Sequence, residues 1–356
     1  MEPTAYAKRM SIVVPCYKTE RYLPACLDSL MAQTLEDIEV ICVNDGSPDG
    51  CLDIMRSYES RYADRIVVVD RENGGLMNAR WSGIDVARGT YVGFVDSDDH
   101  VERTFAEKLY YAINSSNASM ATCGFRRVDL DTGRELSREM CVARTPFLIE
   151  DDPGRIIEVN PAVWNKVYRM ETIRAMHRPS QAPAILEDLV TDLLYYLAAE
   201  RSGKTRPYVF VPRPLVNYMV RPDSMINTIE ADQIESIRRT LVEVRALYVE
   251  EGASRHLLEA LDTLAFVHLG ISMSFRLSYD GNVDLASTMD ETTGFLDESF
   301  PLWRTSPYVE AGYAMRHGTS YRRIHVACLA WKAHLMPALL SGYRLAIERT
   351  GRDIKW

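Results

Sequence analysis

Residues 91–100 read YVGFVDSDDH, an apolar run that ends in a cluster of acidic residues. A short run rich in β-branched and aromatic residues, followed by polar ones, is typical of a buried strand. The same pattern occurs at 10–16, 38–43, 66–69 and 120–125. The first 125 residues therefore predict five strands.

Helical patterns separate these strands, over residues 21–33, 52–62, 77–87 and 101–114. Strands and helices that alternate with a spacing of about 25 residues indicate parallel βαβ units. In such sheets the ligand binds at the carboxyl ends of the strands, so the residues that follow the strands form the candidate site. They are Pro15-Cys16-Tyr17, Asn44-Asp45-Gly46-Ser47-Pro48-Asp49, Glu72-Asn73-Gly74-Gly75 and Asp96-Ser97-Asp98-Asp99.

The later part of the chain changes in character. Residues 184–200 predict a helix, because apolar residues recur there every four positions. Residues 207–220 contain two strand-like pieces interrupted by prolines, and the pattern from 229 onward is mostly helical. We therefore predict an α/β domain over 1–226 and a helical region over 227–356.

Composition excludes several classes of protein. The 356 residues are 47% hydrophobic and 26% charged, as in ordinary globular proteins, and the net charge of −9 argues against nucleic acid as a partner. Seven cysteines without a C-x-x-C pair indicate a reduced, intracellular protein. The N-terminus lacks the apolar stretch of a signal peptide, and no segment reaches the roughly 18 consecutive apolar residues of a membrane span. We expect a cytoplasmic location.

The acidic cluster is the first chemical motif. Asp96 and Asp98 would point to the same side of an extended segment and offer oxygen ligands to Mg²⁺ or Mn²⁺. The alternative is an acidic loop whose aspartates cap the following helix. Dinucleotide-binding, P-loop, nucleophile-elbow and H-E-x-x-H motifs are all absent from the sequence.

Taken together, the motifs resemble glycosyltransferase family 2, whose GT-A fold is a Rossmann-like α/β fold with a mostly parallel sheet flanked by helices. The resemblance runs from about residue 10 to about residue 225. Besides the strand-end motifs it includes Ala79-Arg80, Trp164-Asn165-Lys166-Val167-Tyr168, Leu186-Glu187-Asp188 and Tyr218-Met219-Val220-Arg221. Lys18 and Trp81 depart from the family pattern, which often has asparagine at both positions.

The resemblance implies an inverting transfer of a sugar from a nucleotide-diphosphate sugar, with a UDP-sugar expected, to a hydroxyl group. The implied acceptor is a saccharide or a lipid-linked molecule of cell-surface polysaccharide synthesis. Residues 1–125 would hold the nucleotide-sugar, and residues 126–226 would hold the acceptor. The alternative is a degenerate, non-catalytic protein that binds nucleotide-sugars or serves in assembly. A nucleotidyltransferase on a related fold is disfavoured, because residues 15–18 do not form its glycine-rich loop.

Individual roles follow from the family motifs. The implied contacts are Pro15, Tyr17 and Asp45 to the nucleobase, Asp96 near the ribose, Arg80 to a phosphate or in the base pocket, and Asp98 to the Mn²⁺ or Mg²⁺ on the diphosphate. Asp188 resembles the catalytic base, which would take the proton of the acceptor hydroxyl. The alternative for Glu187 and Asp188 is that both favour the positive end of a helix, and Asp192 is a competing candidate on the same helix face.

Further contacts to the acceptor or the diphosphate would come from Trp164, Lys166, Glu187 and Arg221. A tryptophan can stack on a sugar ring, but a tryptophan packed in the core is the alternative. An arginine can bind the diphosphate as a planar donor fork, but a surface arginine is the alternative.

The C-terminal region carries its own charge pattern. Residues 301–356 contain nine Lys or Arg and three acids, a net charge of +6. Cys328, Trp331 and Leu335 would share one helix face beside basic residues. We weigh three hypotheses for this region: peripheral contact with the inner face of the membrane, a homodimer contact, and packing against the catalytic domain.

Overall fold

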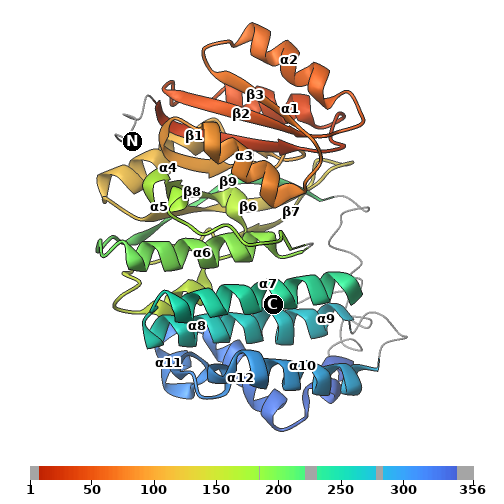
Figure 1. The fold of residues 1–356 in the computed structure, drawn as a ribbon, viewed down its shortest axis with the longest axis vertical. Helices are drawn as coiled ribbons and strands as arrows, with labels where there is room; N and C mark the ends of the chain where they lie inside the picture. The colour runs from red at the N-terminus through yellow and green to blue at the C-terminus, as the bar shows by residue number, and fades with distance from the viewer. Residues whose placement is uncertain (1–7, 184, 221–230, 278–283, 343–356) are drawn as a thin grey trace. The chain divides into compact units, whose positions relative to one another are not determined.

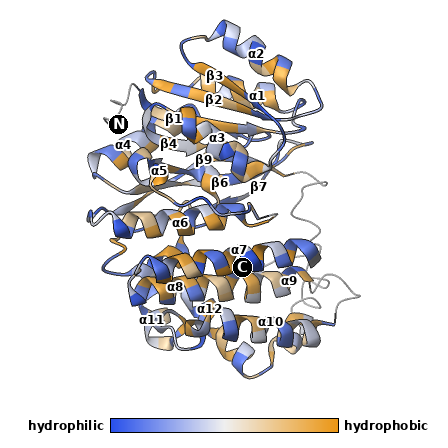
Figure 2. Ribbon diagram, viewed as in Figure 1, coloured by the Kyte–Doolittle hydropathy of each residue, from blue (hydrophilic) through white to orange (hydrophobic). Residues whose placement is uncertain are grey.

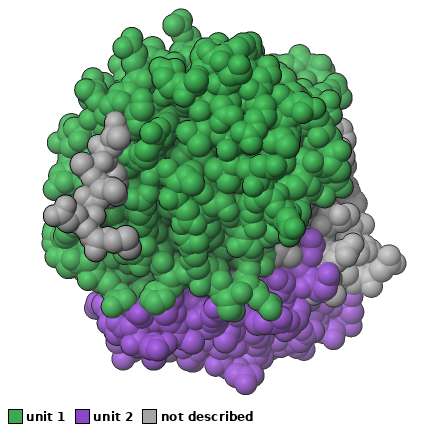
Figure 3. Space-filling view, turned by 45° about the horizontal axis from the view of Figure 1, so that its top comes forward, with its two compact units in different colours: residues 1–151, 160–227 green, residues 152–159, 228–356 purple. Residues whose placement is uncertain are grey.

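The computed structural model describes residues 8–183, 185–220, 231–277 and 284–342. The chain divides into two compact units, Met1–Asp151 with Asn160–Asn227, and Asp152–Val159 with Thr228–Trp356 (Figure 3). The predicted boundary after residue 226 lies outside the described residues. The sequence did not predict that the short segment 152–159 belongs to the second, helical unit.

A sheet of nine strands forms the centre of the first unit, within the residues that the structure describes (Figure 1). Its order is β3-β2-β1-β4-β8-β6-β9-β5, and β7 pairs with β6. Adjacent strands are parallel in β3-β2-β1-β4 and in the pair β6 and β9, and the other pairs are antiparallel. The bounds are β1 Lys8–Cys16, β2 Ile38–Asp45, β3 Ile66–Arg71, β4 Gly89–Phe94, β5 His100–Val101, β6 Met120–Asp129, β7 Glu135–Glu139, β8 Lys166–Arg169 and β9 Tyr208–Val220.

The helices of the first unit are α1 Leu23–Met31, α2 Cys51–Arg61, α3 Leu76–Val86, α4 Phe105–Ser115, α5 Met170–Arg174 and α6 Glu187–Arg201. They confirm the predicted alternation of strands and helices over the first 125 residues. The apolar stripe of α1, which includes Leu23, Leu27 and Leu30, is fully buried against the sheet. The hydrophobic colouring of β1, β2 and β3 in Figure 2 reflects the same core.

The sheet differs from the sequence prediction in the short strands β5, β7 and β8, which were not predicted, and in the region 207–220. The four-residue strand β8 was not predicted, and it lies antiparallel between β4 and β6, so the sheet is mixed. The region 207–220 forms one strand instead of two pieces. Its prolines are accommodated because the register with β6 shifts around Gly124, which faces Pro214, and a proline can sit at such an irregularity without donating a ladder hydrogen bond.

The second unit is helical, as predicted for the C-terminal region. Its α-helices are α7 Ala231–Glu250, α8 Arg255–Ala265, α9 Met273–Leu277, α10 Leu285–Ser299, α11 Ala311–His317 and α12 Thr319–Lys332. Its core includes Phe266, which stacks on Trp303 at 4.5 Å and meets Trp331 edge-on at 5.5 Å. Among the described residues one helical stretch, Arg255–Leu277, is long and apolar enough to span a membrane, but 78% of its apolar 18-residue window is buried inside the structure.

One prediction about the C-terminal region is wrong. Cys328 and Trp331 are buried at 2% exposure, whereas Leu335 is 58% exposed, so the three side chains do not form one outward-facing surface. Helix α12 ends at Lys332, before Leu335, and His334 adopts a left-handed backbone with φ 57°. The change of chain direction therefore separates Leu335 from the helix face that the other two share.

Candidate active site

The acidic segment after β4 forms a turn, in which the Asp99 N–H donates to the Asp96 carbonyl at 3.0 Å. Asp96 and Asp98 are half-buried, whereas Ser97 and Asp99 between and after them are buried. The segment is a turn and not the predicted extended stretch, and binding of a cation by the two aspartates stays a prediction. The buried members hold the turn in place, because Asp99 accepts the Met219 N–H at 2.8 Å.

Arg80 lies at the centre of the site, on α3. Its guanidinium Nη1 is 2.5 Å from Asp188 Oδ1 and 3.8 Å from Glu187 Oε1, and its Nη2 is 3.2 Å from Asp96 Oδ1. The residue is 3% exposed. A planar guanidinium can serve two carboxylates at once through separate N–H groups. Arg80 therefore joins the turn after β4 to the start of α6.

The charges of this cluster influence one another strongly. Burial raises the pKa of Asp96 to about 6, while Arg80 opposes the change and Asp188 adds to it. Burial and the neighbouring Asp188 raise the pKa of Glu187 to about 7, again against Arg80. Burial lowers the pKa of Arg80, but the surrounding carboxylates outweigh it and raise that pKa above its ordinary value. The site therefore holds one fixed cation and carboxyl groups that resist becoming fully ionised together.

Asp188 is held at both carboxylate oxygens. Oδ1 accepts from Arg80, and Oδ2 accepts the Val163 backbone N–H at 3.3 Å. The residue stands in the first turn of α6, where the helix dipole also favours a carboxylate. Leu186, just before the helix, has a left-handed backbone with φ 58°. Such a strained conformation in a residue other than glycine is often found at functional sites. The side chain remains 19% exposed, so a ligand hydroxyl can reach it.

Asp45, at the end of β2, organises the glycine turn before α3. Its Oδ1 accepts the Gly74 N–H at 3.0 Å, and its Oδ2 accepts the Gly75 N–H at 2.8 Å. Arg71 Nη1 lies 3.1 Å from Oδ1. Gly75 has φ 86°, a left-handed value that favours glycine. Asp45 itself is 3% exposed, so its contact with a nucleobase N–H stays a prediction.

Pro15 and Tyr17 flank the end of β1. Pro15 is buried within the strand, and the Tyr17 ring is 44% exposed with the Lys18 ammonium 5.0 Å from its centroid. The Lys18 N–H donates to Ser47 Oγ at 2.7 Å, which ties the loop after β1 to the loop after β2. Tyr17 therefore presents an open aromatic face, as a base-stacking residue requires.

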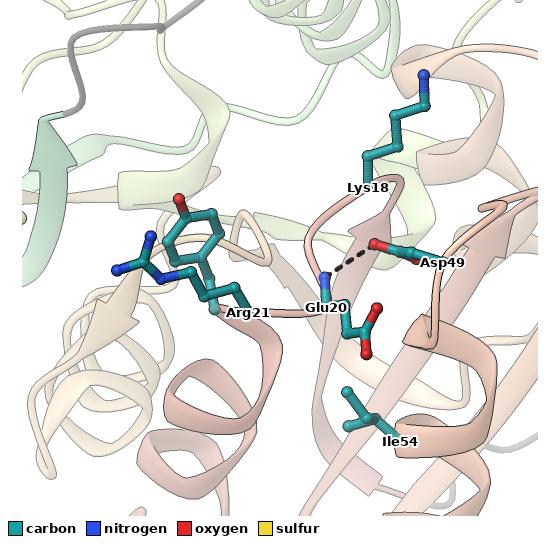
Figure 4. Close-up of a pocket in the computed structure, with 6 residues that line it drawn as sticks. Lys18, Glu20, Arg21, Asp49 and Ile54 are labelled. Atoms are coloured by element: carbon teal, nitrogen blue, oxygen red, sulfur yellow. Dashed lines mark hydrogen bonds between the residues drawn. The ribbon is translucent and has the colours of Figure 1, made fainter.

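The same two loops border a pocket of about 520 Å³, shown in Figure 4. In that view the Glu20 backbone N–H donates to Asp49 Oδ2, at 3.1 Å. The pocket is next to Tyr17 along the chain, and Asp49 of the predicted strand-end motif after β2 lines it. Its lining residues are Lys18, Glu20, Arg21, Tyr22, Asp49 and Ile54.

The predicted contact between Trp164 and an acceptor sugar is not supported. Trp164 is 8% exposed, meets Phe125 edge-on at 4.7 Å, and stacks with Tyr218 at 5.5 Å. The aromatic neighbours already cover the indole, so the core interpretation holds. Arg221, the other predicted polar contact from this part of the chain, lies outside the described residues.

The predicted direct contact of Lys166 is also not supported, because its ammonium is fully buried. It donates to the carbonyls of Asn160 and Ala162, and it lies 3.3 Å from Asp192 Oδ2. The Tyr168 hydroxyl donates to Asp192 Oδ1 at 2.7 Å. Lys166 thus fixes the loop that ends in the Val163 N–H, and Asp192, the competing base candidate, is only 1% exposed and bound within this network.

The side chains of the site supply too few ligands for a divalent cation unless a bound nucleotide adds its phosphate oxygens. No group of three metal-ligating side chains occurs among the residues that the structure describes. Asp96 accepts from Arg80, and the half-buried Asp98 in the same turn carries a second carboxylate, a hard oxygen donor. A cation with one carboxylate ligand and several phosphate oxygens is the arrangement that Mg²⁺ commonly adopts with nucleotides.

Sequence reasoning missed two groups. The Val163 N–H is a backbone donor, so no residue type marks it. The other is Arg71, which precedes the glycine-rich motif. It lies opposite Asp45 in the parallel register of β2 and β3, and the sequence alone does not give that register.

Comparison with known proteins adds independent information. A family model described as glycosyl transferase family 2 matches residues 11–178. EpsH of Bacillus subtilis (strain 168), whose name describes it as a glycosyltransferase, is 30% identical over 272 residues, covering 74% of this chain and 76% of EpsH. The poly(ribitol-phosphate) beta-glucosyltransferase of Bacillus spizizenii is 29% identical over 248 residues, which are 65% of this chain but 38% of that relative.

Solved structures share the fold. S. aureus TarS 1-349 in complex with UDP-GlcNAc has a TM-score of 0.68 at 17% identity, covering 98% of this chain and 93% of that chain. The mannosyltransferase PcManGT from Pyrobaculum calidifontis, in complex with GDP-Man and Mn²⁺, has a TM-score of 0.53 at 16% identity, covering 93% and 88%. The predicted fold class, an α/β sheet flanked by helices with a helical C-terminal region, is confirmed.

Proposed function

Because this chain belongs to glycosyltransferase family 2 and is a glycosyltransferase, we propose that it transfers a sugar, with inversion, from a UDP-sugar to an acceptor hydroxyl. The bridge that Arg80 makes between Asp96 and Asp188 is the observation that carries the proposal. One guanidinium thereby contacts both Asp96, in the turn proposed to bind the donor, and Asp188, the proposed base. Two substrates held there could react directly, because proximity lowers the barrier of a bimolecular step.

The nucleotide would bind at the carboxyl ends of β1 and β2. Tyr17 offers an exposed ring for stacking, and Pro15 and Asp45 border it on the neighbouring strands. A carboxylate that accepts a hydrogen bond suits the imide N–H of uracil or thymine. The UDP-GlcNAc in the TarS complex supports uracil as the first base to test.

The diphosphate would lie over the turn after β4, with Asp96 towards the ribose. A Mn²⁺ or Mg²⁺ ion held by Asp98 and the phosphates would neutralise the charge that develops on the leaving UDP. The Mn²⁺ named with GDP-Man in the PcManGT structure supports this expectation. Arg80 contributes a permanent positive charge nearby, whatever the pH.

Asp188 would act as the general base. With Oδ1 held by Arg80 and Oδ2 held by the Val163 N–H, the carboxylate is fixed in orientation and keeps unshared lone pairs for an acceptor O–H. Asp188 would take the proton of the acceptor hydroxyl while the hydroxyl oxygen bonds to the anomeric carbon. General base catalysis of this kind raises the rate on the order of 10²–10⁴-fold. Glu187 would stay partly protonated at neutral pH, because burial raises its pKa to about 7.

The acceptor is proposed from chemistry and from a relative. The poly(ribitol-phosphate) beta-glucosyltransferase is named for a polymer with free hydroxyl groups. A growing saccharide or a lipid-linked saccharide offers the same nucleophile. We place the reaction in the cytoplasm and in cell-surface polysaccharide synthesis.

Thermal unfolding with UDP, dTDP, GDP and CDP, each with and without Mn²⁺, tests the donor site without any acceptor. Ligand at 100 times its Kd stabilises the folded state by about 2.7 kcal/mol, a shift of several degrees. We expect stabilisation by UDP that needs Mn²⁺ and is lost in Asp98→Ala but kept in the matched control Asp64→Ala, which changes an exposed aspartate in a turn. If no nucleotide shifts the Tm of the folded protein, a degenerate, non-catalytic role in assembly replaces this proposal.

A further inference from the structure

Helices α11 and α12 and the turn after them present an unusual surface. Four large apolar side chains are exposed there, Met315 at 73%, Val326 at 52%, Leu329 at 53% and Leu335 at 58%. Exposed basic side chains accompany them. We define the basic-apolar face by the α12 residues of this surface, Val326 and Leu329 together with Arg322, Arg323 and Lys332.

The geometry of α12 gathers part of this face in one stripe. Arg322, Val326 and Leu329 follow one another at intervals of four and three residues, so they lie on the same side of the helix. The opposite side, which includes Ile324 and Trp331, packs into the helical unit. The helix is therefore anchored from within, while its outer side combines apolar and cationic groups.

The charge of this region is opposite to that of the chain as a whole. Residues 311–347 contain no Asp or Glu, although the complete chain has 50 acids and a net charge of −9. An ordinary solvated helix face intersperses both signs of charge and carries few large apolar groups. A surface that excludes acids and exposes apolar side chains is suited to a partner that is both anionic and apolar.

We propose that the basic-apolar face docks on an anionic lipid bilayer. Lys and Arg side chains near such a surface are attracted to its anionic headgroups, and the apolar side chains would enter the boundary between headgroups and acyl chains. A second copy of the chain is a poorer occupant, because the same cationic groups would repel each other across a two-fold contact. The proposal is independent of the proposed sugar transfer.

The experiment is co-sedimentation of the full chain with vesicles at 50 and 500 mM NaCl. One set of vesicles is pure phosphatidylcholine and the other contains 30% phosphatidylglycerol. We expect binding to the anionic vesicles at low salt, at least tenfold weaker at high salt, because screening weakens attraction between charged surfaces. Arg322→Glu with Arg323→Glu should weaken binding by at least tenfold, and Val326→Ser with Leu329→Ser should weaken it several-fold.

The matched control is Val242→Ser with Val249→Ser, which removes two exposed valines from α7 in the same unit and should bind as wild type. Unchanged thermal unfolding identifies variants that still fold, and UDP stabilisation reports on the donor site separately. Equal binding to neutral vesicles, no binding at low salt, or full binding by the Arg322→Glu, Arg323→Glu variant would overturn the proposal. A concentration-dependent dimer lost in Val326→Ser with Leu329→Ser would also overturn it and assign the face to a second copy.

Discussion

Arg80 Nη1 lies 2.5 Å from Asp188 Oδ1, although 108 positions separate the two residues in the sequence. The contact joins α3, which follows the third strand, to the start of α6. It pairs the implied catalytic base with a cation that cannot lose its proton at physiological pH. The base is therefore oriented by the fold before any substrate binds.

Replacing Asp188 by Asn should lower kcat by about 10²–10⁴-fold, because the amide cannot accept the acceptor's proton. Stabilisation by UDP and Mn²⁺ should stay close to wild type, since the change leaves the strand-end residues intact. The measurement is the rate at which UDP is released from UDP-sugars supplied as donors. Glu200→Gln, near the other end of the same helix, is the control, and a kcat within threefold of wild type for Asp188→Asn would exclude the base assignment.

Replacing Glu187 by Gln should stabilise the protein at pH 8 but not at pH 4. Burial raises the pKa of Glu187 to about 7, so the folded state holds a proton that the unfolded state has already lost. The wild-type free energy of unfolding therefore falls as pH rises from about 4.5 to 7, and the neutral amide avoids that loss. We expect a gain on the order of 2 kcal/mol above pH 7, or a few degrees in Tm. A Tm difference that does not vary with pH would contradict this assignment.

Replacing Lys166 by Met should destabilise the first unit by about 3 kcal/mol or more, because it leaves Asp192 buried without its cation. Urea unfolding measures the change. The double variant Lys166→Met, Asp192→Asn should recover part of the loss, since it removes the uncompensated charge. Additive losses in the double variant would argue against a coupled buried pair.

Replacing Gly83 by Ala should destabilise by about 1–3 kcal/mol, because α3 packs closely on β1 at this point. A Cβ on Gly83 would come within 2.4 Å of Val13 Cγ1 and 3.2 Å of Val13 Cβ. Gly294→Ala in α10 is the matched control. Nothing lies within 4 Å of its Cβ position, so it should stabilise by about 0.5–1 kcal/mol through helix propensity. Thermal unfolding measures both variants, and we expect Tm to fall for Gly83→Ala and to rise for Gly294→Ala.

The sequence predicted most of the first unit's framework, and the reasons are local. The strands β1 to β4 are short apolar runs, and the helices between them carry apolar residues at helical spacing. Both periodicities follow from the geometry of one segment at a time. Because parallel strands end at a common edge, Asp45 and Asp96 could also be assigned to that edge from the sequence.

Only the tertiary structure decided what these residues contact. The Arg80–Asp188 pair joins residues 108 positions apart, and the Val163 N–H lies just before β8, a four-residue antiparallel strand that has no pattern of its own. The burial of Trp164 and Lys166 likewise depends on neighbours distant in sequence. Residue type and spacing thus determined at which edge of the sheet the candidate site residues lie. Packing determined which of their side chains are exposed to a ligand, because burial depends on long-range contacts that a local sequence pattern does not contain.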